Sequence, residues 1–319
     1  MKTPQVKHRL EGAVGVIELD NPPHQFMTTR MVRELDALTA AWAADPAVRC
    51  LVITGATPGL FITHFSVDEL EKSSPMAPDA KVPQAALLAI GGLLRGLDRG
   101  HRLLEHVPPF RRSFEATVKR TPLRIFALLQ EIHRVFSRLE RMDKPVIAAI
   151  GGSAMGGGCE LALACDYRLM ARGDHVIGLV EVLGGIIPGA GGTQRLAATV
   201  GKARAVEMLL EGAVLSPDEA ERVGLVTRAV DADRLMDEAM ALARRLATRP
   251  SVAVGSAKRA VRVGSTLPAD DGLAYEMLAF VMTGLSTDAR RRGAEYIAKF
   301  RAGQSAREIL GAWREGRVS

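Results

Sequence analysis

The sequence predicts an α/β fold in which buried strands alternate with helices, and three neighbouring segments carry this prediction. Residues 12–20, GAVGVIELD, are rich in β-branched side chains and end at the Asn-Pro-Pro of residues 21–23, which breaks a strand. Apolar residues then recur at helical spacing between 31 and 42. The apolar run at 50–53 suits a second strand that is buried on both faces.

The rest of the chain continues this alternation and then becomes helical. Residues 121–139 open with Thr-Pro, a favourable helix start, and carry one apolar face. Residues 145–150 indicate another buried strand, which ends at two glycines. Beyond residue 200 we expect helices over 203–210, after a capping box at 216–219, over 231–248 and again after Pro250.

The composition argues against an exported or membrane-spanning protein. No signal-like apolar segment opens the sequence, and no stretch reaches the ~18 uninterrupted apolar residues of a membrane span. Three cysteines, Cys50, Cys159 and Cys165, fit neither a disulfide framework nor a zinc site. We therefore expect reduced thiols in the core of a soluble, cytoplasmic protein without a metal site.

The net charge of +6 comes from one segment of the chain. Between Lys72 and Lys144 there are fourteen Lys and Arg but only seven Asp and Glu. Such a basic segment can attract a phosphorylated cofactor, an acidic lipid surface or nucleic acid. It can equally be a solvated helix surface, and the sequence leaves these alternatives open.

Two glycine-rich turns, at 151–160 and 184–193, are the strongest chemical signal in the sequence. Neither has the Gly-Lys-Ser/Thr ending of a P-loop or the spacing of a dinucleotide-binding turn. Free backbone N–H groups at a helix start also bind developing negative charge, as in an oxyanion hole. Glu160 and Glu181 stand beside these turns in apolar surroundings, where burial raises a carboxyl pKa toward neutrality. A glutamate at a helix start can also be a simple dipole cap, so the spacing alone leaves both roles open.

The segments that contain these turns, PVIAAIGGSAMGGGCELALACDYRLMA (145–171) and residues 178–226, closely resemble the enoyl-CoA hydratase/isomerase (crotonase) superfamily. The resemblance implies an α/β fold with a crotonase-like ββα spiral core and a carboxy-terminal helical trimerisation region. We expect the core to span 1–225, with an atypical basic, mainly helical insert at about 73–120. The carboxy-terminal helical region would then span 226–319.

Carried over to this sequence, the resemblance makes Glu160 and Glu181 the catalytic pair and puts oxyanion donors on the backbone of Phe65 and Gly157. The segment 61–66, Phe-Ile-Thr-His-Phe-Ser, departs from the family's usual Phe-Ser-Ala-Gly-Ala-Asp. His64 there is a candidate for substrate contact or for an extra base, or is simply structural. The other residues that the resemblance assigns to substrate and coenzyme A binding are Pro23, His24, Gln25, Thr63, Gly189 and, from a neighbouring subunit, Lys299.

The function that this resemblance implies is hydration of a 2-enoyl-CoA thioester, as in fatty acid metabolism. No cofactor would be bound permanently, because coenzyme A is part of the substrate, and a homotrimer or hexamer is expected. Within the superfamily, a Δ3-Δ2-enoyl-CoA isomerase and an acyl-CoA hydrolase or decarboxylase remain alternatives. Arg111 and Arg112 of the insert are candidates for the coenzyme's phosphates. From other classes, an RNA-binding homologue and a catalytically silent scaffold are conceivable, although few aromatic residues are available to stack on bases and we expect no nucleic acid partner.

Overall fold

The computed structural model describes residues 3–73 and 124–317. The chain forms two compact units, one of residues 1–65 with 133–319 and a smaller one of residues 66–132. In the smaller unit the described residues form α2 (Val67–Ser73) and the first turns of α5 (Arg124–Arg141), which continues into the larger unit. The predicted helix start at Thr121, almost all of the basic insert, and Arg111 and Arg112 lie outside the described residues.

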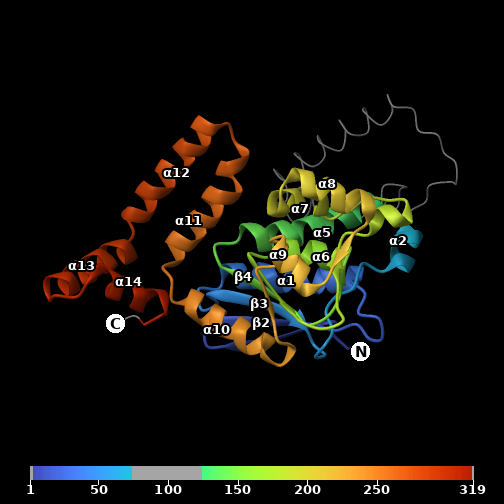
Figure 1. Cartoon of the computed structure of the whole chain (residues 1–319), viewed down its shortest axis with the longest axis horizontal. Helices are drawn as coiled ribbons and strands as arrows, with labels where there is room; N and C mark the ends of the chain where they lie inside the picture. Colours follow the sequence, from blue (N-terminus) through green and yellow to red (C-terminus); the bar gives the residue numbers. More distant parts are fainter. Residues whose placement is uncertain (1–2, 74–123, 318–319) are drawn as a thin grey trace. The chain divides into compact units, whose positions relative to one another are not determined.

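A six-stranded sheet forms the centre of the larger unit (Figure 1). The first two strands form an antiparallel hairpin, and every later neighbour pairs in parallel. In spatial order the strands are β1 (Val6–Glu11), β2 (Val14–Leu19), β3 (Cys50–Gly55), β4 (Val146–Ile150), β6 (Tyr167–Ala171) and β9 (Arg228–Val230). Parallel pairing requires helical crossovers between strands, which is why apolar strand runs and helices alternate along the chain.

Helices cover both faces of this sheet. On one face α10 (Leu235–Ala247) packs its buried residues, Leu235, Ala239, Met240 and Ala243, against alternate side chains of the strands. On the other face α1 (Thr29–Ala44) places the ring of Trp42 directly over Gly15 of β2, where a Cβ atom would collide with it. Thr28 caps α1, accepting a hydrogen bond from Met31 N.

A small second sheet holds the two glycine-rich segments together. It consists of β5 (Ala154–Met155), β7 (Ile177–Gly178) and β8 (Val214–Leu215). Met155 of β5 pairs with Gly178 of β7, so the segment that leads into Glu160 runs beside the segment that leads into Glu181. This pairing brings together two carboxyl groups that are twenty-one residues apart in sequence.

The remaining elements follow the predicted order. They are α6 (Gly157–Leu163), η1 (Glu181–Gly184), α7 (Gly192–Val200), α8 (Lys202–Glu211), α9 (Pro217–Arg222), η2 (Ala232–Arg234), α11 (Ser251–Arg262), η3 (Gly264–Thr266), α12 (Ala269–Gly284), α13 (Thr287–Arg301) and α14 (Ala306–Arg314). The predicted capping box is present, since Ser216 and Glu219 bond each other's backbone at the start of α9. Strand β9 and helix α10 lie beyond residue 225, where the core was expected to end. In the structure β9 belongs to the main sheet, and α10 packs on one face of that sheet.

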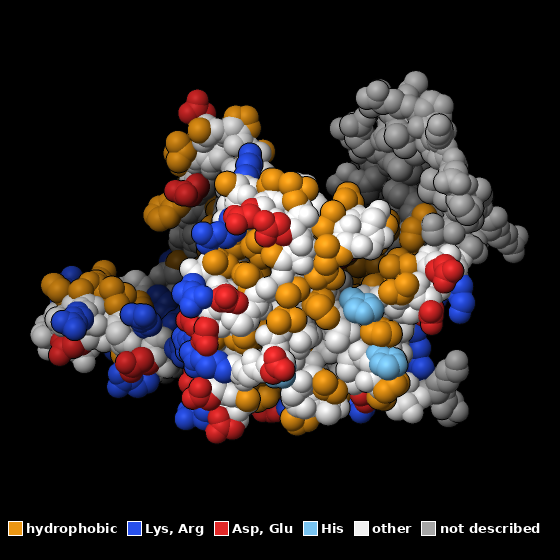
Figure 2. Space-filling view, turned by 45° about the vertical axis from the view of Figure 1, so that its right-hand side comes forward, with side chains coloured by type: hydrophobic (Ala, Val, Ile, Leu, Met, Phe, Trp, Pro, Cys, Tyr) orange, Lys and Arg blue, Asp and Glu red, His pale blue; other side chains and the backbone are white. Residues whose placement is uncertain are grey.

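Three further features concern surface and core. All three cysteines are buried free thiols, as predicted, and burial raises the pKa of Cys50 and Cys165 to about 12. None of the helices in the described residues combines the length and apolarity needed to cross a bilayer. Figure 2 shows apolar side chains on the surface of the molecule. Six apolar residues of α12 are each more than half exposed: Leu273, Met277, Leu278, Phe280, Val281 and Met282.

Candidate active site

The site is assembled where the loops after β3 and β4 meet, at the carboxyl ends of parallel strands. Met155 N donates to Thr63 O at 2.7 Å, and Thr63 N donates to Gln25 O at 3.1 Å. Met27 N in turn donates to His64 O at 2.8 Å. Three loops distant in sequence are thereby fixed to one another by backbone hydrogen bonds. Ligand sites of parallel α/β sheets form at this edge.

Two free amides lie next to each other in this assembly. A Cβ atom added to Gly157 would lie 3.2 Å from the amide nitrogen of Phe65, so the two backbones touch. Gly157 is the first residue of α6, and the N–H groups of a first helical turn have no partner within the helix. Neither the Phe65 nor the Gly157 amide donates any of the hydrogen bonds found among the described residues. Adjacent amides that donate to no described residue are the kind of group that an oxyanion hole uses.

Glu160 is a buried carboxyl held by two backbone amides. It lies in the first turn of α6, as predicted, and is 3 % exposed. Its Oε1 accepts hydrogen bonds from Ala190 N at 2.7 Å and Gly192 N at 2.8 Å. Burial raises the pKa of Glu160 to about 7, with repulsion by Glu181 adding to the rise and the two amides opposing it. This carboxyl can exchange a proton near neutral pH.

Glu181 is the second carboxyl and opens η1. Its Oε1 lies against Gly156, 3.2 Å from the position that a Cβ atom would take there. Its Oε2 is buried and takes no hydrogen bond from any residue that the structure describes. Burial raises the pKa of Glu181, while its own amide and the nearby His64 oppose the rise. An oxygen in this state can meet a water molecule or a substrate atom.

His64 sits beside this carboxyl in an aromatic stack. Its ring packs on Phe26 with centroids 4.4 Å apart, and Phe26 packs on His24 at 5.1 Å. The Nδ1 atom of His64 lies 2.8 Å from Phe65 O, which ties the ring to the residue that supplies an oxyanion amide. The side chain thus has a structural anchor as well as a position near Glu181.

The predicted coenzyme A residues fall into two groups. Pro23 and His24 are exposed beside the site, and His24 O accepts from Thr63 Oγ1 at 3.1 Å. Gln25 is buried, and its side chain accepts a hydrogen bond from Asn21 N at 2.8 Å, so only its backbone faces Thr63. These residues therefore form one contiguous edge of the site.

Of the two remaining predicted binding residues, Gly189 lies beside the site and Lys299 does not. Gly189 directly precedes Ala190, whose amide donates to Glu160. Lys299 lies on α13, where it pairs with Glu295 at 2.7 Å, and Figure 1 shows α13 far from α6. Within the described chain Lys299 does not join the site.

The structure adds residues that sequence reasoning missed. The amides of Ala190 and Gly192 anchor Glu160, and Arg195 donates from Nη1 to Ala190 O at 2.7 Å. The one feature of the sequence that could have indicated this anchor is the glycine pair before Thr193, because α7 begins at Gly192. Glycine is required at 192, because a Cβ atom there would lie 2.9 Å from Glu160 Oε1.

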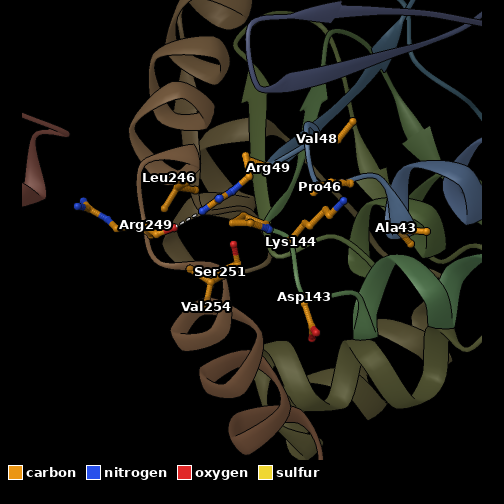
Figure 3. Close-up of a pocket in the computed structure, with 12 residues that line it drawn as sticks. Ala43, Pro46, Val48, Arg49, Asp143, Lys144, Leu246, Arg249, Ser251 and Val254 are labelled. Atoms are coloured by element: carbon orange, nitrogen blue, oxygen red, sulfur yellow. Dashed lines mark hydrogen bonds between the residues drawn. The ribbon is translucent and has the colours of Figure 1, made fainter. Parts of the chain in front are cut away.

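A separate pocket of about 230 Å³ lies at the opposite edge of the main sheet, because two of its lining residues, Arg49 and Pro145, immediately precede β3 and β4 (Figure 3). The basic side chains that line this pocket donate hydrogen bonds to backbone carbonyl oxygens. Arg49 donates to Arg249 O at 2.7 Å, and Lys144 donates to Asp45 O at 2.5 Å at the end of α1. We assign these side chains to capping helix ends, a structural role.

Taken together, the loops at this edge of the sheet bring one buried and one half-buried carboxyl, both with raised pKa values, close to the adjacent amides of Phe65 and Gly157. Comparison with known proteins agrees with an acid/base site of this kind. Residues 124–302 match the family model described as enoyl-CoA hydratase/isomerase. The chain belongs to this family, and the expected crotonase fold is confirmed.

Individual relatives cover nearly the whole chain. The short-chain-enoyl-CoA hydratase of Clostridium acetobutylicum is 43% identical over 91% of this chain and 93% of its own length. A probable enoyl-CoA hydratase of Rhizobium meliloti is 33% identical over 92% and 94%. Among solved structures, the enoyl-CoA hydratase of Bacillus anthracis superposes with a TM-score of 0.71 at 26% identity, covering 92% of this chain and 96% of that chain.

Proposed function

We propose that this protein is an enoyl-CoA hydratase that adds water across the 2,3 double bond of a 2-enoyl-CoA thioester. The observation that supports the proposal is the gathering of a buried carboxyl, Glu160, and a half-buried one, Glu181, near the adjacent amides of Phe65 and Gly157. Relatives bearing the names enoyl-CoA hydratase, short-chain-enoyl-CoA hydratase and crotonyl-CoA hydratase support the same reaction.

The reaction follows from the chemistry of these groups. The two amides donate to the thioester oxygen, and they stabilise the negative charge that develops there when water adds to the β-carbon. One carboxylate takes a proton from the attacking water, and the other carboxyl delivers a proton to the α-carbon. Because Glu160 and Glu181 repel each other's charge, the pair favours a state that holds one proton, and this is the state that the reaction needs.

Isomerisation is the second candidate within the family. Shifting a double bond from position 3 to position 2 needs one carboxylate to move a proton, whereas hydration uses two. Two carboxyls with pKa values raised by burial lie in this site, which favours hydration. A hydrolase or decarboxylase reaction on another acyl-CoA has no group in the described site that favours it over hydration.

For substrate binding we propose the edge formed by Pro23, His24, Gln25, Thr63 and His64, with Gly189 near the carboxyls. Pro23 and His24 are exposed there and can meet the coenzyme. Lys299 would act from a neighbouring subunit on the coenzyme's phosphates, and Arg111 and Arg112 remain candidates for the same task. Coenzyme A would enter and leave as part of the substrate, with no cofactor bound permanently.

We further propose that the chain works as a homotrimer or hexamer in the cytoplasm, without a nucleic acid partner. Helix α12 supports assembly, because it contains no buried residue yet carries the large apolar side chains named above. An uncovered apolar helix of this kind is typical of a protein–protein contact.

The test is hydration of crotonyl-CoA and longer 2-enoyl-CoA thioesters, followed by the loss of enoyl-thioester absorbance. Glu160→Gln and Glu181→Gln are compared with Asp237→Asn, which changes an exposed carboxyl on α10 that takes no part in the site. Each Gln variant should lower kcat by at least about a hundredfold while the protein stays folded. A wild-type protein that binds acyl-CoA but never hydrates it would overturn the proposal.

A further inference from the structure

A continuous series of polar contacts leads from the carboxyl of Glu160 to α11 in the carboxy-terminal helices. It begins with the Ala190 amide, which donates to Glu160 Oε1 at 2.7 Å. The carbonyl of the same residue, Ala190 O, accepts from Arg195 Nη1 at 2.7 Å. One peptide segment thus joins the catalytic carboxyl on one side to a guanidinium on the other.

The guanidinium of Arg195 is itself held in place. Only 9 % of Arg195 is exposed, and its Nε and Nη2 atoms donate to Glu140 Oε2 at 3.1 and 3.0 Å. Gly191 has a φ of 97°, and a Cβ atom on it would overlap the guanidinium. A fork of this kind fixes a planar cation in one orientation, which an ammonium group on a flexible stem does not do.

The series continues from Glu140 on α5 to α11. Arg262 Nη1 donates to Glu140 Oε1 at 2.8 Å, and Arg262 Nη2 donates to Asp166 Oδ1 at 3.3 Å. Asp166 Oδ2 also accepts from Lys258 Nζ at 2.6 Å and from Val146 N at the start of β4 at 2.8 Å. The far end of the series is therefore tied to β4 as well as to α11.

We infer that Arg195, Glu140 and Arg262 are positioning residues, which hold the segment of residues 190–192 so that its amides fix the Glu160 carboxyl for proton transfer. The inference rests on the proposed function, since it assigns Glu160 a role in the reaction. In this inference none of the three residues needs to touch the substrate. They act through the Ala190 peptide, because a shift of that peptide would release the carboxyl that its amide anchors.

The charge of Arg195 affects the pKa of Glu160 in a definite direction. The groups facing Glu160 are Glu181 from η1, the Arg195 cation from α7, its neighbour Cys159 and the amides of Ala190 and Gly192. The positive charge of Arg195 lowers the pKa of Glu160, whereas burial and Glu181 raise it. Loss of that charge would therefore raise this pKa further.

The test compares Arg195→Gln, Arg195→Lys, Glu140→Gln and Arg262→Gln with Arg138→Gln as a matched control. Arg138 is on the same helix as Glu140 and donates to Asp36 Oδ1 at 2.7 Å, in a half-buried ion pair that does not lead to Glu160. All variants are assayed for hydration and for thermal unfolding. Arg195→Gln should lower kcat roughly tenfold to a hundredfold with KM changed less than about threefold, and Arg195→Lys should fall between it and the wild type.

Glu140→Gln and Arg262→Gln should lower kcat by smaller factors, and the double variant should lose less than the product of the two. Arg138→Gln should reduce the unfolding temperature without lowering kcat. If the Arg195 and Glu140 variants lose stability alone, as Arg138→Gln does, the inference is wrong.

A readout independent of turnover separates this inference from the proposed function. The ionisation of the Glu160 carboxyl is followed by infrared pH titration, and Glu160→Gln identifies its band. Arg195→Gln should move this titration to higher pH, whereas Arg138→Gln should leave it unchanged. An unmoved titration in Arg195→Gln would sink the inference, whereas an active Glu160→Gln variant would sink the proposed function.

Discussion

A Cβ atom on Gly157 would lie 3.2 Å from the amide nitrogen of Phe65, so these two backbones approach too closely to admit a side chain without a shift. The gap between the loop after β3 and the start of α6 is thus set by a glycine. The two amides stay adjacent only while that gap stays as it is.

We expect Gly157→Ala to lower kcat by about tenfold to a hundredfold, because the added methyl group pushes the Phe65 amide by a few tenths of an ångström. Gly184→Ala is the control, since a Cβ atom on Gly184 meets nothing within 4 Å. Steady-state hydration kinetics check the result. Equal activity of the two variants would contradict the assignment of the Phe65 and Gly157 amides.

The raised pKa of Glu160 predicts how stability depends on pH. The folded protein holds this proton up to about pH 7, whereas the unfolded chain releases it near 4.5. The stability that the neutral Glu160 carboxyl contributes is therefore fully present below pH 4.5 and is lost as pH rises through about 7. Since the difference amounts to about 3 kcal/mol at most, Glu160→Gln should unfold at higher denaturant concentration than the wild type at pH 8.5.

At pH 5 the advantage of Glu160→Gln should be small, because most wild-type molecules then carry a neutral carboxyl at this site. Urea unfolding at both pH values measures the difference. A variant that is equally stabilised at pH 5 and pH 8.5 would show that its effect comes from packing and not from ionisation.

Activity should follow a bell-shaped dependence on pH. Two protons on the carboxyl pair leave no base, and no protons leave no acid, so kcat/KM should be greatest where the pair holds one. The alkaline fall should lie near the pKa of about 7 for Glu160. Rates measured between pH 5 and 9 in buffers of equal ionic strength check this, and a flat profile would contradict shared acid/base roles.

The cysteines should resist alkylation in the native protein. Cys50, Cys159 and Cys165 are buried, and burial raises the pKa of all three thiols, so almost no thiolate is available at neutral pH. Iodoacetamide should modify none of them within the time that it modifies all three in urea. Mass spectrometry counts the adducts, and rapid native labelling of any one would refute this expectation.

Helix α12 offers a test of assembly. Phe280 is 76 % exposed in the single chain, so Phe280→Asp should disrupt a subunit contact made through this helix. Glu276→Ala changes an exposed polar residue of the same helix and serves as the control. Light scattering after size exclusion reports the mass. An unchanged mass for Phe280→Asp would exclude α12 as the contact.

The sequence by itself determined three strands of the main sheet and several of its helices, because apolar periodicity is local. Strands β2, β3 and β4 and helices α1, α6, α8 and α9 lie within a few residues of the predicted segments. Strands β1, β6 and β9 of the main sheet were not predicted. The residues of β1 are mostly exposed and carry no apolar alternation. The place of Glu160 in a first helical turn also followed from the glycines before it.

Only the tertiary structure decided how the site is held together. The bonds from Ala190 and Gly192 to Glu160 span thirty residues or more, and the ion pair from Arg195 to Glu140 spans fifty-five. Contacts of this range depend on where chain crossings bring two loops, and no local pattern of residue types encodes that position. For the same reason the touching amides of Phe65 and Gly157 follow from the packing of the loop after β3 against the start of α6.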